Sequence, residues 1–148
     1  MAPELESRWM TAWLLLLRTH TRFWDQIEEH MRREHGLTMA RYDVLVQLDM
    51  AGGRLGLSEL ASAIALSPSG LSKLLDRMDA SGLVRRDPDP DDARAAFATI
   101  TPRGRALARS ARASHHALLR GTFGSALNDR DIADLTRIMK RIDTSLQR

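Results

Sequence analysis

The segment from Ser67 to Gly82 constrains the fold more than any other part of this sequence. Ser67 is a favoured N-cap residue, and Pro68 follows at the first helical position, where a missing N–H costs nothing. Apolar residues then recur at three- and four-residue steps, the spacing of an amphipathic helix: Leu71, Leu74, Leu75 and Met78. Gly82 is suited to a left-handed helix end. The segment is therefore predicted to be a short capped helix with one apolar face.

A β-hairpin is predicted directly after this helix. Residues 83–86 and 97–100 read as two short extended segments rich in apolar and β-favouring residues. Between them, prolines and aspartates from Asp87 to Asp92 favour turns, and we expect no strand or helix there. The two strands and a tip of roughly eight residues would form the hairpin.

Three helices are predicted before the capped helix. The first covers about residues 5–31, with a long apolar stripe, and Gly36 is expected to end it. The second begins after Thr38 as its cap and stops at Gly52 and Gly53; the third is short and capped by Ser58. The inward-facing residues are expected to be Tyr42, Leu45, Val46 and Met50 in the second helix and Leu60, Ala61 and Ile64 in the third.

Two helices are predicted after the hairpin. Thr101 and Pro102 repeat the cap-and-proline signal and open a helix that runs to about Phe123, and Asn128 caps the last one. The last helix has a nearly heptad apolar stripe, made of Ile132, Leu135, Met139, Ile142 and Leu146. The predicted fold is mainly α with a small β-hairpin wing: four helices, the hairpin and two helices, as in a winged helix-turn-helix.

The polar side of the segment 67–82 suits contact with DNA. A helix-turn-helix lays its second helix in the major groove, which requires small and polar side chains opposite the apolar face. That side would present Ser69, Lys73, Asp76 and Ala80, flanked by Ser72 and Arg77. Asp76 is the discordant member, and we expect it to lie beyond the base edges or to pair with a neighbouring arginine. Residues 93–128 contain six arginines and no acidic residue, which suits phosphate contact or, alternatively, a solvated helix face.

Several functional classes are disfavoured. The chain has no cysteine, which excludes disulfides and cysteine-ligated metals, and we expect no metal site and no cofactor. It shows no phosphate-binding glycine loop and no nucleophile elbow, so we do not expect an enzyme. It shows no apolar run long enough to cross a membrane and no signal peptide. We expect a cytoplasmic protein.

The ordered set of motifs resembles the MarR family of winged-helix regulators. The resemblance is carried by six stretches: residues 42–45 (YDVL), 60–61 (LA), 67–78 (SPSGLSKLLDRM), 82–86 (GLVRR), 92–94 (DAR) and 100–104 (ITPRG). In this family the wing pattern is Asp-any-Arg followed by a strand that ends in Leu-Thr, and here Ile100 replaces the leucine. The similarity covers almost the whole chain.

This resemblance implies a transcription regulator, most commonly a repressor, that binds a palindromic operator on double-stranded DNA as a homodimer. It implies that residues 1–36 and 102–148 form a helical dimerisation region and residues 37–101 the DNA-binding lobe, within one intertwined domain. It places the recognition-helix contacts at Ser67, Pro68, Ser69, Ser72, Lys73 and Arg77, and it places Arg94 in the wing, oriented by Asp92.

Many members of the family release DNA when a small aromatic or anionic molecule binds between the dimer region and the lobe. The residues that the resemblance suggests for such an effector are Trp13, His20, Met39, Tyr42, Asp43 and Val46. The alternative for this set is an ordinary hydrophobic junction. The alternative for the whole chain is an architectural or protein-interaction winged-helix protein without sequence-specific regulation.

Overall fold

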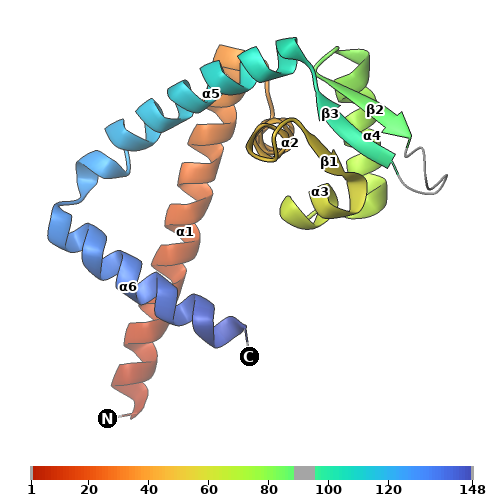
Figure 1. Ribbon diagram of the computed structural model, residues 1–148. Helices are drawn as coiled ribbons and strands as arrows, with labels where there is room; N and C mark the ends of the chain where they lie inside the picture. Colours follow the sequence, from red (N-terminus) through yellow and green to blue (C-terminus); the bar gives the residue numbers. More distant parts are fainter. Residues whose placement is uncertain (1, 89–95, 148) are drawn as a thin grey trace. The chain divides into compact units, whose positions relative to one another are not determined.

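The fold is taken from a computed structural model that describes residues 2–88 and 96–147, with side chains described from Ser7 onward. The order of elements is α1 (Ala2–His35), α2 (Met39–Met50), β1 (Arg54–Gly56), α3 (Leu57–Ala63), α4 (Pro68–Ala80), β2 (Val84–Pro88), β3 (Ala96–Ile100), α5 (Pro102–Gly121), the 3-10 turn η1 (Gly124–Ala126) and α6 (Asp129–Leu146) (Figure 1). A small antiparallel sheet in the order β1-β3-β2 accompanies the helices. The predicted class, mainly α with a β-hairpin wing, is confirmed.

The chain forms two compact units, Met1–Arg112 and Ala113–Arg148, and the boundary falls within α5. The first unit contains the three strands, helices α1 to α4 and the first part of α5. The second contains the end of α5, η1 and α6. The division that the resemblance implied, with a lobe over residues 37–101, remains a prediction about the assembled protein.

The predicted helix caps at Thr38, Ser67 and Asn128 are confirmed. The Ser67 hydroxyl accepts a hydrogen bond from the Gly70 N–H at 3.1 Å, and the Thr38 hydroxyl accepts from the Arg41 N–H at 3.3 Å. The Asn128 side chain accepts from the Asp131 N–H at 3.0 Å, and the Asp131 carboxylate accepts from the Asn128 N–H at 3.1 Å. These side chains satisfy N–H groups that the helices leave free at their first turns.

The start of α3 was predicted wrongly. The helix begins at Leu57 with Gly56 as N-cap, so Ser58 lies inside it. The reason is a strand that was not predicted: β1 pairs with β3, Arg54 opposite Thr99 and Gly56 opposite Phe97, and this pairing keeps the backbone extended up to Gly56. A strand of three residues is too short to show the alternation by which strands are recognised in a sequence.

The wing strand β2 is longer than predicted. It includes Asp87 and Pro88, which were expected to lie in a turn, and Pro88 pairs with Ala96. β2 is an edge strand of the sheet, and an edge position tolerates a residue that has no N–H to donate. The Asp87 carboxylate also accepts a hydrogen bond from the Thr99 hydroxyl on β3, at 2.8 Å, which holds it in the sheet.

One continuous hydrophobic core fills the first unit. It runs from Met31 at the end of α1, through α2, α3, α4 and the sheet, to Ala111 on α5. Leu45, Leu60, Leu71 and Leu75 are buried as predicted, but Met50 is 73% exposed. In α2 the inward positions are completed instead by Val44 and Leu48, because the last turn of α2 leads into the exposed residues Ala51 and Gly52.

Apolar side chains remain exposed on two helices. Among the described side chains of α1, Ile27 and Met31 are the hydrophobic ones that pack against the core, whereas Trp9, Trp13, Leu14, Leu15, Leu16, Leu17 and Trp24 are exposed. In the second unit α6 has no buried residue at all among those described, and Ile132, Met139, Ile142 and Leu146 of its predicted stripe are exposed. The amphipathic faces predicted from the sequence therefore exist, but neither is covered within its own unit.

Candidate nucleic-acid interface

Helix α4 presents its apolar residues inward and its polar residues outward. Leu71, Leu75 and Met78 are buried against the core. Most of the residues predicted to contact DNA are exposed: Ser67, Pro68, Ser69, Lys73 and Arg77, with Ser72 half-buried. This helix thus places hydroxyl and cationic groups together on one surface, and such groups are the donors that proteins use toward base edges and phosphates.

The acidic residue on this surface is paired. The Arg86 guanidinium, on β2, donates through Nη1 to Asp76 Oδ1 at 2.7 Å and to Ser72 Oγ at 3.2 Å. Of the two fates expected for Asp76, pairing with a neighbouring arginine is the one observed. The pair neutralises the carboxylate on a surface that would face a polyanion, and it ties the wing to α4. Arg86 was not recognised from the sequence as part of this site.

Two further arginines hold the end of α4. Arg41 Nη2, on α2, donates to the hydroxyl of Ser81 at 2.8 Å, and Ser81 is the C-cap residue of α4. Arg103 Nη1, on α5, donates to the Ser81 carbonyl oxygen at 2.9 Å. The C-terminal end of α4 is therefore fixed to two other helices. No signal in the sequence could have indicated this, because Arg41 and Ser81 are 40 positions apart.

The base of the wing has a polar outer face formed by alternate residues of three strands. Arg85, Thr99 and Arg54 lie opposite one another in the sheet, and Asp87 lies opposite Phe97. Arg85 Nε donates to Asp87 Oδ1 at 2.8 Å. The hydrogen bond from Arg85 lowers the pKa of Asp87, as does the one from Thr99, and the same carboxylate raises the pKa of Arg85.

Arg54 lies across this face of the sheet. Its guanidinium carbon stands 3.8 Å from the ring centroid of Phe97, a cation–π arrangement that fixes an exposed positive charge at the edge of the sheet. The predicted wing contacts Asp92 and Arg94 lie outside the described residues, so their role remains a prediction.

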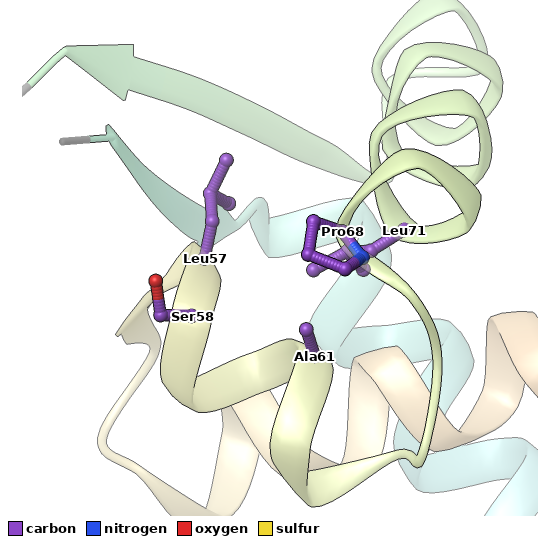
Figure 2. Close-up of a pocket in the computed structure, with 5 residues that line it drawn as sticks. All are labelled: Leu57, Ser58, Ala61, Pro68 and Leu71. Carbon is purple, nitrogen blue, oxygen red and sulfur yellow. The ribbon is translucent and has the colours of Figure 1, made fainter. Parts of the chain in front are cut away.

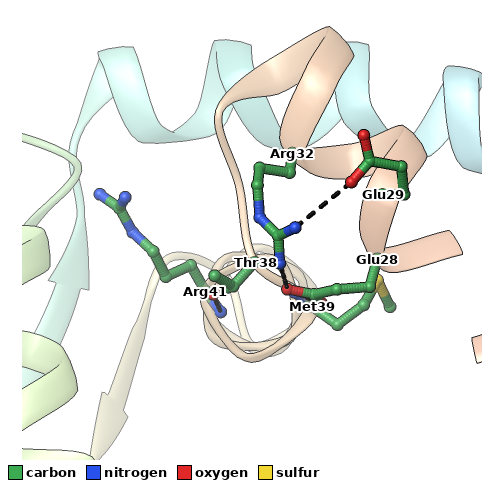
Figure 3. A network of polar contacts seen from close by, with 6 residues as sticks. All are labelled: Glu28, Glu29, Arg32, Thr38, Met39 and Arg41. Atoms are coloured by element: carbon green, nitrogen blue, oxygen red, sulfur yellow. Dashed lines mark hydrogen bonds and ion pairs between the residues drawn. The ribbon is translucent and has the colours of Figure 1, made fainter. Parts of the chain in front are cut away.

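A polar network joins α1 to the start of α2 (Figure 3). Glu28 Oε2 accepts the backbone N–H of Met39 at 2.8 Å, and its other oxygen accepts from Arg32 at 3.0 Å. The carboxylate thereby caps α2 from a different helix, beside the Thr38 cap. This contact is the polar link between the helix that carries the exposed tryptophans and the helix-turn-helix.

Four of the six residues predicted to bind an effector lie together on α2. Met39 and Tyr42 are buried, and Asp43 and Val46 are half-buried. Burial raises the pKa of the Asp43 carboxyl. Burial also raises the pKa of the Tyr42 hydroxyl, and the positive charge of Arg112 opposes that shift.

Two arginines of α5 converge on Asp49 at the end of α2. Arg105 Nη1 donates to Asp49 Oδ1 at 2.8 Å, and Arg112 Nη2 lies 3.6 Å from Asp49 Oδ2. Asp49 retains only 14% of its side-chain exposure, so this is the least exposed carboxylate among the ion pairs of the described residues. It anchors the first part of α5 to α2.

The other two residues predicted to bind an effector, Trp13 and His20, are not brought to this group. Both are exposed, and the His20 ring stacks on Trp24 of the same helix with centroids 6.1 Å apart. They precede Ile27, the first core-packing residue of α1, by fourteen and seven positions, or about 21 and 10 Å along the helix axis. Within one chain they therefore lie apart from the four α2 residues.

Other kinds of site find no support in the part of the chain that the structure describes. Across residues 7–88 and 96–147 no three histidine or acidic residues lie close enough to hold a metal ion. Within the same ranges none of the helices has the length and apolar character that crossing a membrane requires.

Comparison with known proteins identifies the family. A sequence model described as MarR family matches residues 35–95. The crystal structure of AbsC, a MarR family transcriptional regulator from Streptomyces coelicolor, superposes with a TM-score of 0.84 at 33% identity, over 93% of each chain. The chain belongs to the MarR family. It is therefore a DNA-binding transcriptional regulator and not an enzyme, as predicted from the sequence.

Two further solved structures of the MarR-type fold are similar over most of the chain. Sco3205 from Streptomyces coelicolor, solved in complex with DNA, has 27% identity and a TM-score of 0.85, covering 94% of this chain and 88% of its own. BpsR from Bordetella bronchiseptica, whose DNA binding is regulated by 6-hydroxynicotinic acid, has 25% identity and a TM-score of 0.76, covering 90% of this chain and 98% of its own.

Proposed function

We propose that this MarR family member acts as a homodimeric, sequence-specific repressor, that α4 of each chain enters the major groove of a palindromic operator, and that a small aromatic or anionic effector releases it. The observation that carries the proposal is the outward face of α4, where Ser67, Ser69, Lys73 and Arg77 are exposed together. The DNA complex of the related Sco3205 supports this use of the fold.

Pairing of two chains is supported by the uncovered apolar residues. A monomeric protein rarely leaves large apolar side chains clustered in solvent. Trp9, Trp13 and Leu16 on α1, and Ile132 and Ile142 on α6, are each between 39% and 51% exposed. A homodimer that covers both helices would remove this surface from water, and its two-fold symmetry would match a palindromic site.

The experiment that tests the DNA interface compares two lysines. The sequence contains two lysines, Lys73 on α4 and Lys140 on α6. We expect Lys73→Ala to weaken binding to a site selected from random duplexes by about fivefold or more at fixed salt, the effect of one lost base contact. Lys140→Ala removes the same charge outside α4 and is expected to leave the affinity unchanged. Equal effects of the two substitutions would contradict the assignment of α4.

The specificity ratio decides between regulation and the architectural alternative. A regulator is expected to bind its selected site at least about a thousandfold more tightly than unrelated duplex DNA at the same salt. A ratio near one would favour a winged-helix protein that binds DNA, or another protein, without sequence preference. In a reporter assay, a repressor lowers transcription from a promoter that carries the selected site.

The wing and the effector need separate tests. Arg94→Ala is expected to weaken operator binding while leaving the dimer intact. Unchanged affinity would contradict the assignment of Arg94 as the wing contact to DNA.

For the effector, 6-hydroxynicotinic acid serves as the probe because it regulates the DNA binding of the related BpsR. We expect it to lower operator affinity and expect Tyr42→Phe or Asp43→Asn to reduce that response. Because Trp13 and His20 lie about 10 to 21 Å along α1 from its core-packing residues, we propose that they contribute only from the second chain of the dimer.

A further inference from the structure

A small hollow lies between the first turns of α3 and α4 (Figure 2). It has a volume of about 110 Å³ and is lined by Leu57, Ser58, Ala61, Pro68 and Leu71. Ala61 and Leu71 are 6% and 1% exposed, whereas Ser58 and Pro68 are exposed and stand where the hollow meets solvent. Pro68 is the one lining residue among the predicted DNA contacts, so those contacts do not by themselves account for a concave apolar surface at this place.

The chemistry of the lining limits what can occupy it. Four of the five lining residues are hydrocarbons, and the Ser58 hydroxyl is the one polar side chain. A phosphate oxygen or the polar edge of a base would lose hydrogen bonds to water there without replacing them, which is unfavourable. The favoured occupant is a small apolar group attached to something that approaches the first turn of α4.

The position of the hollow indicates where that group comes from. Pro68 is the first residue of α4 and lies between Ser67 and Ser69, which are exposed on the surface proposed to face DNA. In helix-turn-helix proteins the N-terminal residues of the second helix contact base edges. The hollow is therefore continuous with the part of α4 that would lie deepest in the major groove.

Among the groups that base pairs present in the major groove, the one methyl group is that on C5 of thymine. We propose that the hollow between α3 and α4 receives a thymine methyl group and so selects thymine at one position in each half of the operator. The hollow is larger than a methyl group, so no rearrangement of the helices is needed. This inference rests on the proposed binding of DNA through α4.

Replacement of thymine by deoxyuridine tests the inference directly, because uracil pairs as thymine does and lacks only the methyl group. Starting from a duplex selected from random sequences, each thymine is replaced in turn and the affinity is measured at fixed salt. We expect one thymine in each half-site whose replacement lowers affinity about fourfold, the effect of losing one buried methyl group. If no single replacement changes the affinity, the inference is overturned, although binding through α4 stands. If no preferred duplex emerges from the selection, the proposed function itself has failed.

Variants then assign the effect to the hollow. Ala61→Val fills it, and Leu57→Ala removes one wall, so each is expected to abolish the difference between thymine and uracil duplexes. The half-buried position of Leu57 makes the second variant the safer one if Ala61→Val fails to fold. The control is Ser69→Ala, because Ser69 lies on the first turn of α4 but does not line the hollow. It is expected to lower the overall affinity for DNA and to keep the fourfold difference between thymine and uracil duplexes. A difference that persists in both hollow variants would overturn the assignment.

Discussion

The core around α4 and the stripe of α6 use similar apolar side chains with opposite results. Leu71, Leu75 and Met78 of α4 are 1%, 0% and 0% exposed, whereas Ile132 and Ile142 of the α6 stripe are each 42% exposed. Both sets recur at helical spacing, so the sequence pattern alone does not distinguish them. The difference lies in what each helix meets: α4 packs against α3 and β2 in its own unit, and α6 finds no interior there.

Size explains why the second unit has no interior. It comprises only Ala113–Arg148, and units below about 40 residues seldom bury enough surface to fold alone without disulfides, metals or a partner chain. The chain has no cysteine. The core of the first unit is therefore complete within one chain, whereas the apolar residues of α6 would be covered only by the second chain of the proposed dimer.

Removal of a core leucine should have the largest effect. Leu75→Ala deletes a fully buried side chain of α4 and is expected to lower the free energy of unfolding by about 2–5 kcal/mol, from lost burial and a residual cavity. Urea denaturation measures this loss. Because the leucine is buried within one chain, the loss of stability should not vary with protein concentration. A strong dependence on protein concentration would contradict the conclusion that the core around α4 is complete within one chain.

Gly104→Ala should follow in size. A Cβ atom at this buried position would collide with the Leu83 carbonyl oxygen, so α5 must move away from the residue that directly precedes β2. We expect a loss of about 1–3 kcal/mol, typical of overpacking. Gly121→Ala, also in α5, meets no atom within 4 Å and is the matched control. Equal stability of the two variants would show that the close contact between α5 and Leu83 is not a constraint.

A charged substitution in the α6 stripe tests whether this exposed apolar surface is buried in the proposed dimer. Ile142→Asp places a charge where the proposed dimer would bury a hydrocarbon, and we expect the dimer dissociation constant to rise about tenfold or more. Sedimentation equilibrium measures it. Arg141→Asp changes the neighbouring residue, which lies off the stripe, and is expected to have a smaller effect. A chain that is monomeric before any substitution would refute the pairing altogether.

The elements that could be predicted from the sequence are those specified by local chemistry. The helix caps are an example: Ser67, Thr38 and Asn128 each accept a hydrogen bond from the N–H three positions later. Such caps can therefore be recognised from the neighbouring sequence alone. Strand β1 exists only because β3 pairs with it, more than 40 positions later, and Pro88 stays in a strand only because it lies at the sheet edge. These depend on tertiary contacts that no local pattern encodes.

The candidate site divides in the same way. The exposure of Ser69 and Lys73 follows from the helical period of the leucines opposite them. The links from Arg86 to Asp76 and from Arg41 to Ser81 join residues that are 10 and 40 positions apart and only meet once the lobe has folded. Glu28 likewise caps a helix that begins eleven positions later. The exposed polar face of α4 was therefore predictable, but the contacts of α4 with arginines distant in the sequence were not.

The smallest expected effect concerns two aspartates of the lobe whose pKa values move in opposite directions. Burial raises the pKa of Asp43 above that of the unfolded chain, so the folded state binds the proton more tightly and stability falls as the pH rises from about 4 through the raised pKa. Hydrogen bonds from Arg85 and Thr99 lower the pKa of Asp87. Its contribution to the stability of the folded state is therefore present above about pH 4 and is lost as the pH falls through the lowered pKa.

We expect Asp43→Asn to raise the free energy of unfolding at pH 7 by about 0.5 kcal/mol and Asp87→Asn to lower it. Urea titrations at pH 7 and pH 3, at one protein concentration, measure both, and the gain in Asp43→Asn should vanish at the lower pH. A gain that persists at pH 3 would mean that it comes from packing around α2 and not from the charge.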